Sequence, residues 1–214
     1  MAESIAESFA ADAATAAALS ADDALQAALV NATAAIAATR ALGGECLVTG
    51  LGKSGAVAIR LAASLASTGC PAHFVHAAEW AHGDLGKMAS LRAGGVEATK
   101  ASLTTIIAIS HSGRTAEVVG ACKEAAARGV RVVLIAGGGA DASSSTAGAV
   151  ADHVLGYALP EGVVEPYGGA PTASIVAQEA VANALVRALA DHIAFDPTRF
   201  RRNHPGGALG ESLK

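Results

Sequence analysis

The sequence predicts an α/β fold in which helices cover both faces of a parallel β-sheet. Five short apolar or β-branched runs, each bounded by glycine, proline or polar residues, alternate with helix-length segments. Two of these runs, Thr105–Ile109 and Val130–Ile135, are nearly continuously apolar, as expected for strands buried on both sides. The length of 214 residues suits one domain of this class. We therefore expect a three-layer αβα sandwich with a five-stranded parallel sheet.

The elements follow in order along the chain. Two Ala-rich helices are expected within residues 1–42; Ser20 is the predicted N-cap of the second, with Asp22 and Asp23 in its first turn. The predicted strands are Cys46–Thr49, Ala72–His76, Thr104–Ser110, Val130–Ala136 and His153–Tyr157. The predicted helices of the core are Gly55–Ala66, Thr115–Arg128, a short piece at Ser143–Ala149, and Thr172–His192, and a loop is expected at Gly137–Ser145. The expected organisation is one domain over 1–214, with the core at 45–192 and a tail at 193–214.

The composition excludes several classes of protein. A chain with 52% hydrophobic and 16% charged residues is too apolar to be intrinsically disordered. No uninterrupted apolar stretch reaches the ~18 residues of a membrane span, so no membrane partner is expected. A net charge of −4 without a basic run argues against a nucleic-acid partner. Because the three cysteines form no CxxC pair and the N-terminus lacks a basic segment, we expect no disulfide framework, no targeting peptide and a cytoplasmic protein.

The segment GLGKSG (Gly50–Gly55) follows the first predicted strand and opens a helix. A Walker A loop is excluded because the position of its first glycine is Leu47, within the strand. The G-x-G-x-x-G spacing of a dinucleotide site is present, but the acidic residue expected about twenty positions later is displaced, since Glu79 lies beyond the second strand. A purely structural turn with a solvated Lys53 is a further alternative. The remaining interpretation of GLGKSG is a phosphate-binding loop, because glycines expose backbone N–H groups at a helix N-terminus.

A second hydroxyl-rich turn, SHSGRT (Ser110–Thr115), follows the third predicted strand. Alone, each turn fits a structural role. Together, at the carboxyl ends of strands in one sheet, they favour a site for a phosphate monoester. The candidate phosphate-binding residues are Gly52, Ser54, Ser110, Ser112 and Thr115.

A His- and Asp-containing segment, HGDLG (His82–Gly86), follows the second predicted strand, near His73 and Glu79. Neither H-E-x-x-H nor H-x-x-E-H is present, and His73 and His76 would point to opposite faces of a strand. We therefore expect no metal and interpret His82 as a polar active-site residue.

Six segments together resemble the sugar isomerase (SIS) domain of the D-arabinose 5-phosphate isomerases. They are LGKSG, SLASTG, HFVHAAEWAHGDLG, SHSGRTAE, APTAS and HPGGALG, which occur in this order from about residue 50 to 213. The resemblance implies a flavodoxin-like αβα fold and a cofactor-independent isomerase that interconverts D-arabinose 5-phosphate and D-ribulose 5-phosphate through an enediol. A homodimer or homotetramer with sites at the subunit interface is also implied.

The resemblance further implies which residues act. The Lys of GKSG corresponds to Lys53, the Glu of SxSGxxxE to Glu117, the Glu upstream of APT to Glu165 and the His of HPGG to His204. His82 is a further candidate catalytic residue. Because His204 follows the final helix in a tail with Pro197, we expect it to reach the site of a neighbouring protomer.

Three departures from the family pattern bear on this assignment. VVEPYGGAPT replaces the usual segment before APT, so either Glu165 or Glu161 must substitute for the family's Glu. The connection at 89–103 is longer than in the family, and the C-terminal CBS domains of many members are not expected here. The alternatives to an arabinose 5-phosphate isomerase are a SIS protein that binds a sugar phosphate without turnover and an isomerase of a related sugar phosphate.

Overall fold

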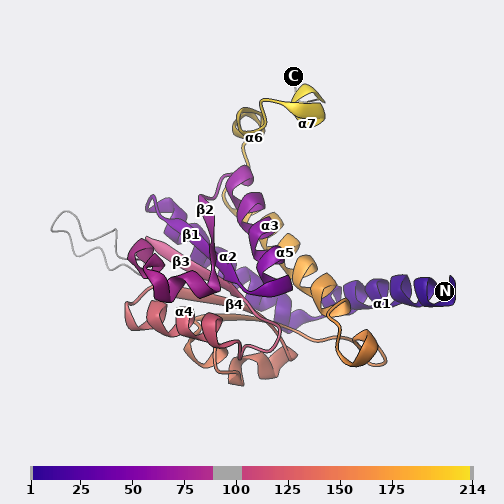
Figure 1. Ribbon diagram of the computed structural model, residues 1–214. Helices are drawn as coiled ribbons and strands as arrows, with labels where there is room; N and C mark the ends of the chain where they lie inside the picture. Colours follow the sequence, from indigo (N-terminus) through magenta and orange to yellow (C-terminus); the bar gives the residue numbers. More distant parts are fainter. Residues whose placement is uncertain (1, 89–102, 213–214) are drawn as a thin grey trace.

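The computed structural model describes residues 2–88 and 103–212. It contains a parallel sheet of five strands in the order β2-β1-β3-β4-β5 (Figure 1). The strands are β1 (Glu45–Gly50), β2 (Ala72–His76), β3 (Thr104–Ile109), β4 (Arg131–Gly137) and β5 (His153–Tyr157). Every neighbouring pair is parallel, which confirms the predicted sheet.

Helices and 3-10 turns cover the sheet on both faces. One face carries α2 (Asp23–Ala41), α3 (Gly52–Thr68) and α5 (Ala173–His192), with α1 (Ala2–Ser20) packed beside α5. The other face carries α4 (Ala116–Ala127) and the 3-10 turns η1 (Ala77–His82), η2 (Asp84–Met88), η4 (Gly139–Ser144) and η5 (Gly148–Val150). A further 3-10 turn, η6 (Pro166–Gly168), precedes α5, and α6 (Pro197–Asn203) and α7 (Gly207–Ser212) form a tail that extends away from the sandwich (Figure 1).

The apolar core lies in two layers separated by the sheet, because successive strand side chains point to opposite faces. On β4, Val133 and Ile135 join the cluster under α2, α3 and α5, whereas Val132 and Leu134 join the cluster under α4. All four are fully buried. This alternation between two covered faces explains why the central strands are continuously apolar in the sequence.

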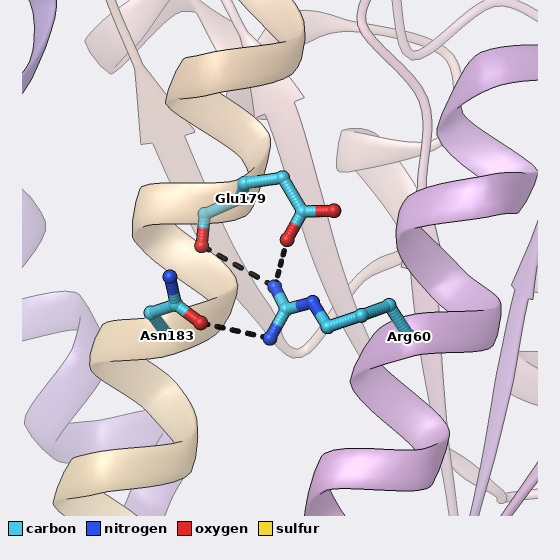
Figure 2. A network of polar contacts seen from close by, with 3 residues as sticks. All are labelled: Arg60, Glu179 and Asn183. Atoms are coloured by element: carbon cyan, nitrogen blue, oxygen red, sulfur yellow. Dashed lines mark hydrogen bonds and ion pairs between the residues drawn. The ribbon is translucent and has the colours of Figure 1, made fainter.

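A polar contact joins α3 to α5 at the surface of this core (Figure 2). The guanidinium of Arg60 forms an ion pair with Glu179 and donates a 2.8 Å hydrogen bond to Oδ1 of Asn183. Nη2 of Arg60 also donates a 3.4 Å hydrogen bond to the backbone oxygen of Glu179. One α3 side chain thus contacts two successive turns of α5, which fixes the two helices that begin near the site described below.

Several local predictions differ from the structure. Ser20 is not the N-cap of α2 but the last residue of α1; Asp22 is the N-cap, because its Oδ1 accepts a 2.9 Å hydrogen bond from the N–H of Leu25. The short helix expected at Ser143–Ala149 is instead the pair of 3-10 turns η4 and η5, and the first of these occupies the expected loop. The tail carries two short helices. Residues 89–102 of the predicted insertion lie outside the described residues.

Within the described part of the chain, no helix is both long and apolar enough to cross a membrane.

Candidate functional site

The two glycine- and hydroxyl-containing turns begin side by side. Gly50, the last residue of β1, pairs in register with Ile109, the last residue of the neighbouring β3. From β1 the chain enters α3 on one face, and from β3 it enters α4 on the opposite face. The strand order therefore reverses between β1 and β3, and a crevice at such a reversal is where parallel α/β sheets bind ligands.

Glycine is required in the first turn because strand and helix approach closely. A Cβ atom on Gly50 would lie 2.9 Å from the backbone oxygen of Ser54, and Gly52 has a positive φ of 59°. Lys53 lies exposed in the first turn of α3, and no hydrogen bond or ion pair joins its ammonium to the rest of the described chain. The turn therefore offers backbone N–H groups, the half-buried Ser54 and an exposed cation to an anion.

Hydrogen bonds of its own hydroxyl groups stabilise the second turn. Ser110 is buried, and its Oγ lies 3.1 Å from Oγ1 of Thr115, the N-cap of α4. Oγ of the exposed Ser112 accepts a 3.2 Å hydrogen bond from the N–H of Arg114. Gly113 (φ 61°) leaves no room for a side chain, since a Cβ there would lie 2.2 Å from Oγ of Ser145. The turn thus presents small hydroxyl groups ahead of the N-terminus of α4.

Glu117 and His82 lie on the face of the sheet that α4 covers. Glu117 is exposed in the first turn of α4. His82 is the exposed last residue of η1, which packs against α4. The buried Trp80 anchors η1 by donating a 2.9 Å hydrogen bond from Nε1 to Oγ1 of Thr49 in β1. The structure therefore places Lys53 and Glu117 directly after the neighbouring strands β1 and β3, at one end of the sheet, and His82 on η1, which packs against α4.

Glu165 is engaged by the N-terminus of α5. Its Oε2 accepts hydrogen bonds from the N–H and hydroxyl of Thr172 and from the N–H of Ala173, and its Oε1 accepts one of 2.9 Å from the N–H of Ser174. Burial alone would raise the pKa of Glu165, but these hydrogen bonds from Ser174 and Thr172 lower it to about 2. Glu165 is therefore a carboxylate that caps a helix. Glu161 is exposed and lines a cavity of about 1040 Å³ between α1 and the segment before α5.

His204 lies at the other end of the molecule from Lys53. It ends α6, where its Nδ1–H donates a 2.8 Å hydrogen bond to the carbonyl of Phe200. The neighbouring Asn203 donates to the backbone oxygen of Ser67, in the last turn of α3. Ser67 is fourteen residues from Lys53 on the same helix, or about 21 Å along its axis. The structure of one chain thus does not bring His204 to the turns after β1 and β3.

A buried polar network adjoins the second turn, and the sequence patterns considered above did not reveal it. Nδ1 of His111 lies 2.8 Å from the hydroxyl of Tyr157, which accepts a 2.9 Å hydrogen bond from Nε2 of Gln178. Tyr157 and Gln178 are fully buried. The signal in the sequence was a histidine within SHSGRT and a tyrosine at a strand end, but their pairing spans three strands.

Among the described residues, no group of three or more His, Cys, Asp or Glu side chains is arranged to hold a metal ion. Nε2 of His73 lies 3.4 Å from Oε2 of Glu45 at the surface. The buried Cys46 and Cys70 have their Sγ atoms 3.8 Å apart, at the amino end of β1 and away from the two turns.

Comparison with known proteins identifies the family to which the chain belongs. The chain is 34% identical over 171 residues to the Escherichia coli arabinose 5-phosphate isomerase KpsF, and 36% identical over 170 residues to KdsD of E. coli K12. Each alignment covers 79% of this chain, which spans about half (47%) of the length of either relative. The solved structure of an E. coli CFT073 protein in complex with arabinose 5-phosphate is 25% identical, with a TM-score of 0.76 over 95% of this chain and 96% of that one. The sequence model of the SIS domain matches residues 44–188, and the chain belongs to the SIS domain family.

Proposed function

We propose that the protein is an aldose–ketose isomerase that interconverts D-arabinose 5-phosphate and D-ribulose 5-phosphate. The observation that carries this proposal is the meeting of two hydroxyl-rich turns and an exposed Lys53 where the strand order reverses. Such an edge suits a phosphate monoester, because both turns offer small donors at helix N-termini. The similarity to two arabinose 5-phosphate isomerases supports the choice of sugar.

The proposed reaction moves protons without changing the composition of the sugar. A base removes the proton from C2, the C–H electron pair forms a C1=C2 double bond, and the carbonyl electrons move to O1 to give an enediolate. Transfer of the C2 hydroxyl proton to O1, and return of a proton from the conjugate acid of the base to C1 as the C2 carbonyl forms, then give the ketose. This chemistry needs a base, a donor for the developing oxyanion and a group that opens the sugar ring.

The residues of the two turns and of the elements beside them supply these roles in our proposal. Gly52, Ser54, Ser110, Ser112 and Thr115 bind the phosphate. Lys53 neutralises the phosphate or an oxyanion, since a flexible ammonium suits either. Glu117 is the proposed base at carbon, and His82 assists at the oxygens. Glu165, with its carboxylate bound to α5, contributes by fixing the start of that helix beside the site.

A second protomer completes the site in this proposal. Asn203, next to His204, binds the end of α3 at Ser67, about 21 Å along the helix axis from Lys53, so a direct role for the His204 imidazole requires the tail of another copy. The tail extends away from the sandwich (Figure 1). We therefore propose a homodimer or homotetramer with sites at the subunit interface.

The direct test is an assay of ribulose 5-phosphate formation from D-arabinose 5-phosphate, run in parallel with the 5- or 6-phosphates of ribose and glucose and with sedoheptulose phosphate. Preferential turnover of the arabinose ester supports the proposal. Turnover of a different ester would indicate an isomerase that acts on another sugar phosphate. Saturable binding without any turnover would instead favour a SIS domain that only binds a sugar phosphate.

A further inference from the structure

His111 occupies the middle of the second turn, between two of the proposed phosphate-binding serines. Its backbone oxygen accepts a 2.9 Å hydrogen bond from the N–H of Gly137 at the end of β4. The imidazole lies over the same glycine, since a Cβ on Gly137 would come within 2.6 Å of Nδ1. The ring therefore crosses the carboxyl end of β4 and reaches Tyr157 at the end of β5. Its position depends on a glycine that leaves it room.

The hydrogen-bond inventory of this network determines which imidazole nitrogen carries the proton. The hydroxyl of Tyr157 has one hydrogen to donate and already accepts a hydrogen bond from Nε2 of Gln178. Its buried hydrogen is satisfied only if Nδ1 of His111 is unprotonated and accepts it. Burial also raises the pKa of Tyr157 well above its ordinary value, so the phenol keeps that hydrogen.

The orientation of the Gln178 amide supports the same assignment. As placed, its buried Oε1 has no partner among the described residues. Reversing the amide would leave both of its N–H groups without partners, whereas the present orientation pairs one of them with Tyr157. Unpaired buried N–H groups are rarer in proteins than under-satisfied oxygens. The amide nitrogen therefore belongs next to Tyr157, and the phenol hydrogen remains directed at His111.

We propose that Tyr157 and Gln178 hold His111 as the neutral Nε2–H tautomer, and that this N–H donates a hydrogen bond to an oxygen of the sugar phosphate bound at the two turns. The identity of that ligand rests on the proposed function above; the tautomer does not. Nε2 is on the side of the ring away from Nδ1 and Tyr157, and the residue is exposed. A fixed neutral imidazole can polarise a carbonyl and stabilise an enediolate without giving up its proton.

Imidazole nitrogen chemical shifts test the first half of this proposal in the ligand-free protein. A two-dimensional ¹⁵N–¹H spectrum, with the His111 signals assigned by their loss in His111→Gln, is expected to show a protonated Nε2 and a bare Nδ1. Tyr157→Phe is expected to weaken that preference to the smaller one of an unconstrained histidine, whereas Tyr167→Phe, at the exposed second tyrosine, leaves it unchanged. A protonated Nδ1 in the wild-type protein overturns the assignment.

Titration with D-arabinose 5-phosphate tests the second half. The His111 Nε2–H signal is expected to shift and saturate together with the backbone signals of the two turns. A His111 signal that stays in place while the turn signals saturate overturns the donor role and leaves the proposed function intact. If the turn signals do not respond and no sugar phosphate is converted, the proposed function fails, and the ligand named here fails with it.

Kinetics provide a readout that a purely structural role would not reproduce. Loss of one such donor is expected to lower kcat about tenfold, with a much smaller change in KM. His111→Leu should show this loss, and His111→Gln, which keeps an N–H donor, should recover part of it; His192→Gln at the far end of α5 is the matched control. Gly137→Ala should reproduce the loss by displacing the ring. Equal kcat values for His111→Leu and wild type overturn the proposal, and thermal melts verify that each variant is folded.

Discussion

The carboxylate of Glu165 accepts a 2.9 Å hydrogen bond from the backbone N–H of Ser174, nine residues later, and so occupies the N-terminus of α5. The N-cap residue itself, Thr172, makes no side-chain cap bond; its hydroxyl donates to Glu165 instead. A distant carboxylate thus performs the usual function of an N-cap side chain, which satisfies backbone donors that a helix leaves unpaired.

Glu165→Gln is expected to lower the free energy of unfolding by about 1 kcal/mol at neutral pH, the usual value of a helix cap. The pKa of Glu165 in the folded protein is depressed to about 2, so its contribution is fully present above the unfolded pKa of ~4.5. It is lost as the pH falls from there towards 2. Urea unfolding of both proteins at pH 7 and pH 3 checks this.

Glu161→Gln is the matched control for that measurement, because Glu161 is exposed in the same segment. It should leave the free energy of unfolding close to the wild-type value at both pH values. A difference between wild type and Glu165→Gln that does not shrink on acidification would contradict the capping role.

Lys53→Ala is expected to lower kcat/KM at least about a hundredfold. A charge contact to an anion in a shielded site contributes roughly 1.5–3 kcal/mol, which corresponds to tenfold to more than a hundredfold, and a catalytic role would add to this. Steady-state kinetics with D-arabinose 5-phosphate measure the loss, and Lys123→Ala, exposed on the outer part of α4, is the control. A change in kcat/KM of less than threefold would show that Lys53 contacts solvent and not the substrate.

Mixing two inactive variants tests whether His204 acts across a subunit interface. His204→Ala and Glu117→Gln are each expected to be nearly inactive, and a mixed C₂ dimer would contain one doubly damaged site and one intact site. Random pairing after dissociation and reassociation should therefore restore roughly a quarter of the wild-type activity. If no activity returns although subunit exchange is demonstrated, His204 and Glu117 act within one chain.

Activity is expected to be unaffected by EDTA and not to increase on addition of divalent cations. The motivation is the donor set: the described residues contain no group of three His, Cys, Asp or Glu side chains suited to a metal. The measurement is the initial rate before and after chelation and dialysis. Loss of activity that a single divalent ion restores would show that the expectation is wrong.

Much of the fold and part of the candidate site could be predicted because the relevant signals are local. A run such as Thr105–Ile109 reveals a buried strand by itself, and a glycine turn directly after a strand must lie at its carboxyl end. The sequence therefore determined the five parallel strands, the position of both turns, and Lys53 and Glu117 as candidates near them. The Ser20 prediction was wrong for a local reason as well: Asp22 has the extended backbone directly before α2, and its carboxylate accepts the hydrogen bond from the N–H of Leu25.

Only the tertiary structure decided which side chains meet across large separations in the chain. His111 and Tyr157 are 46 residues apart, and their contact requires three strands in register and a glycine beneath the ring. Cys46 and Cys70 form no sequence motif, yet parallel pairing of β1 and β2 places their sulfur atoms 3.8 Å apart. The sequence marked Glu165 by its place before APT, but its hydrogen bonds to α5, and hence its low pKa, depend on the path of the loop. Composition and periodicity report how each segment is buried, whereas the partner of a polar group depends on where the rest of the chain is packed.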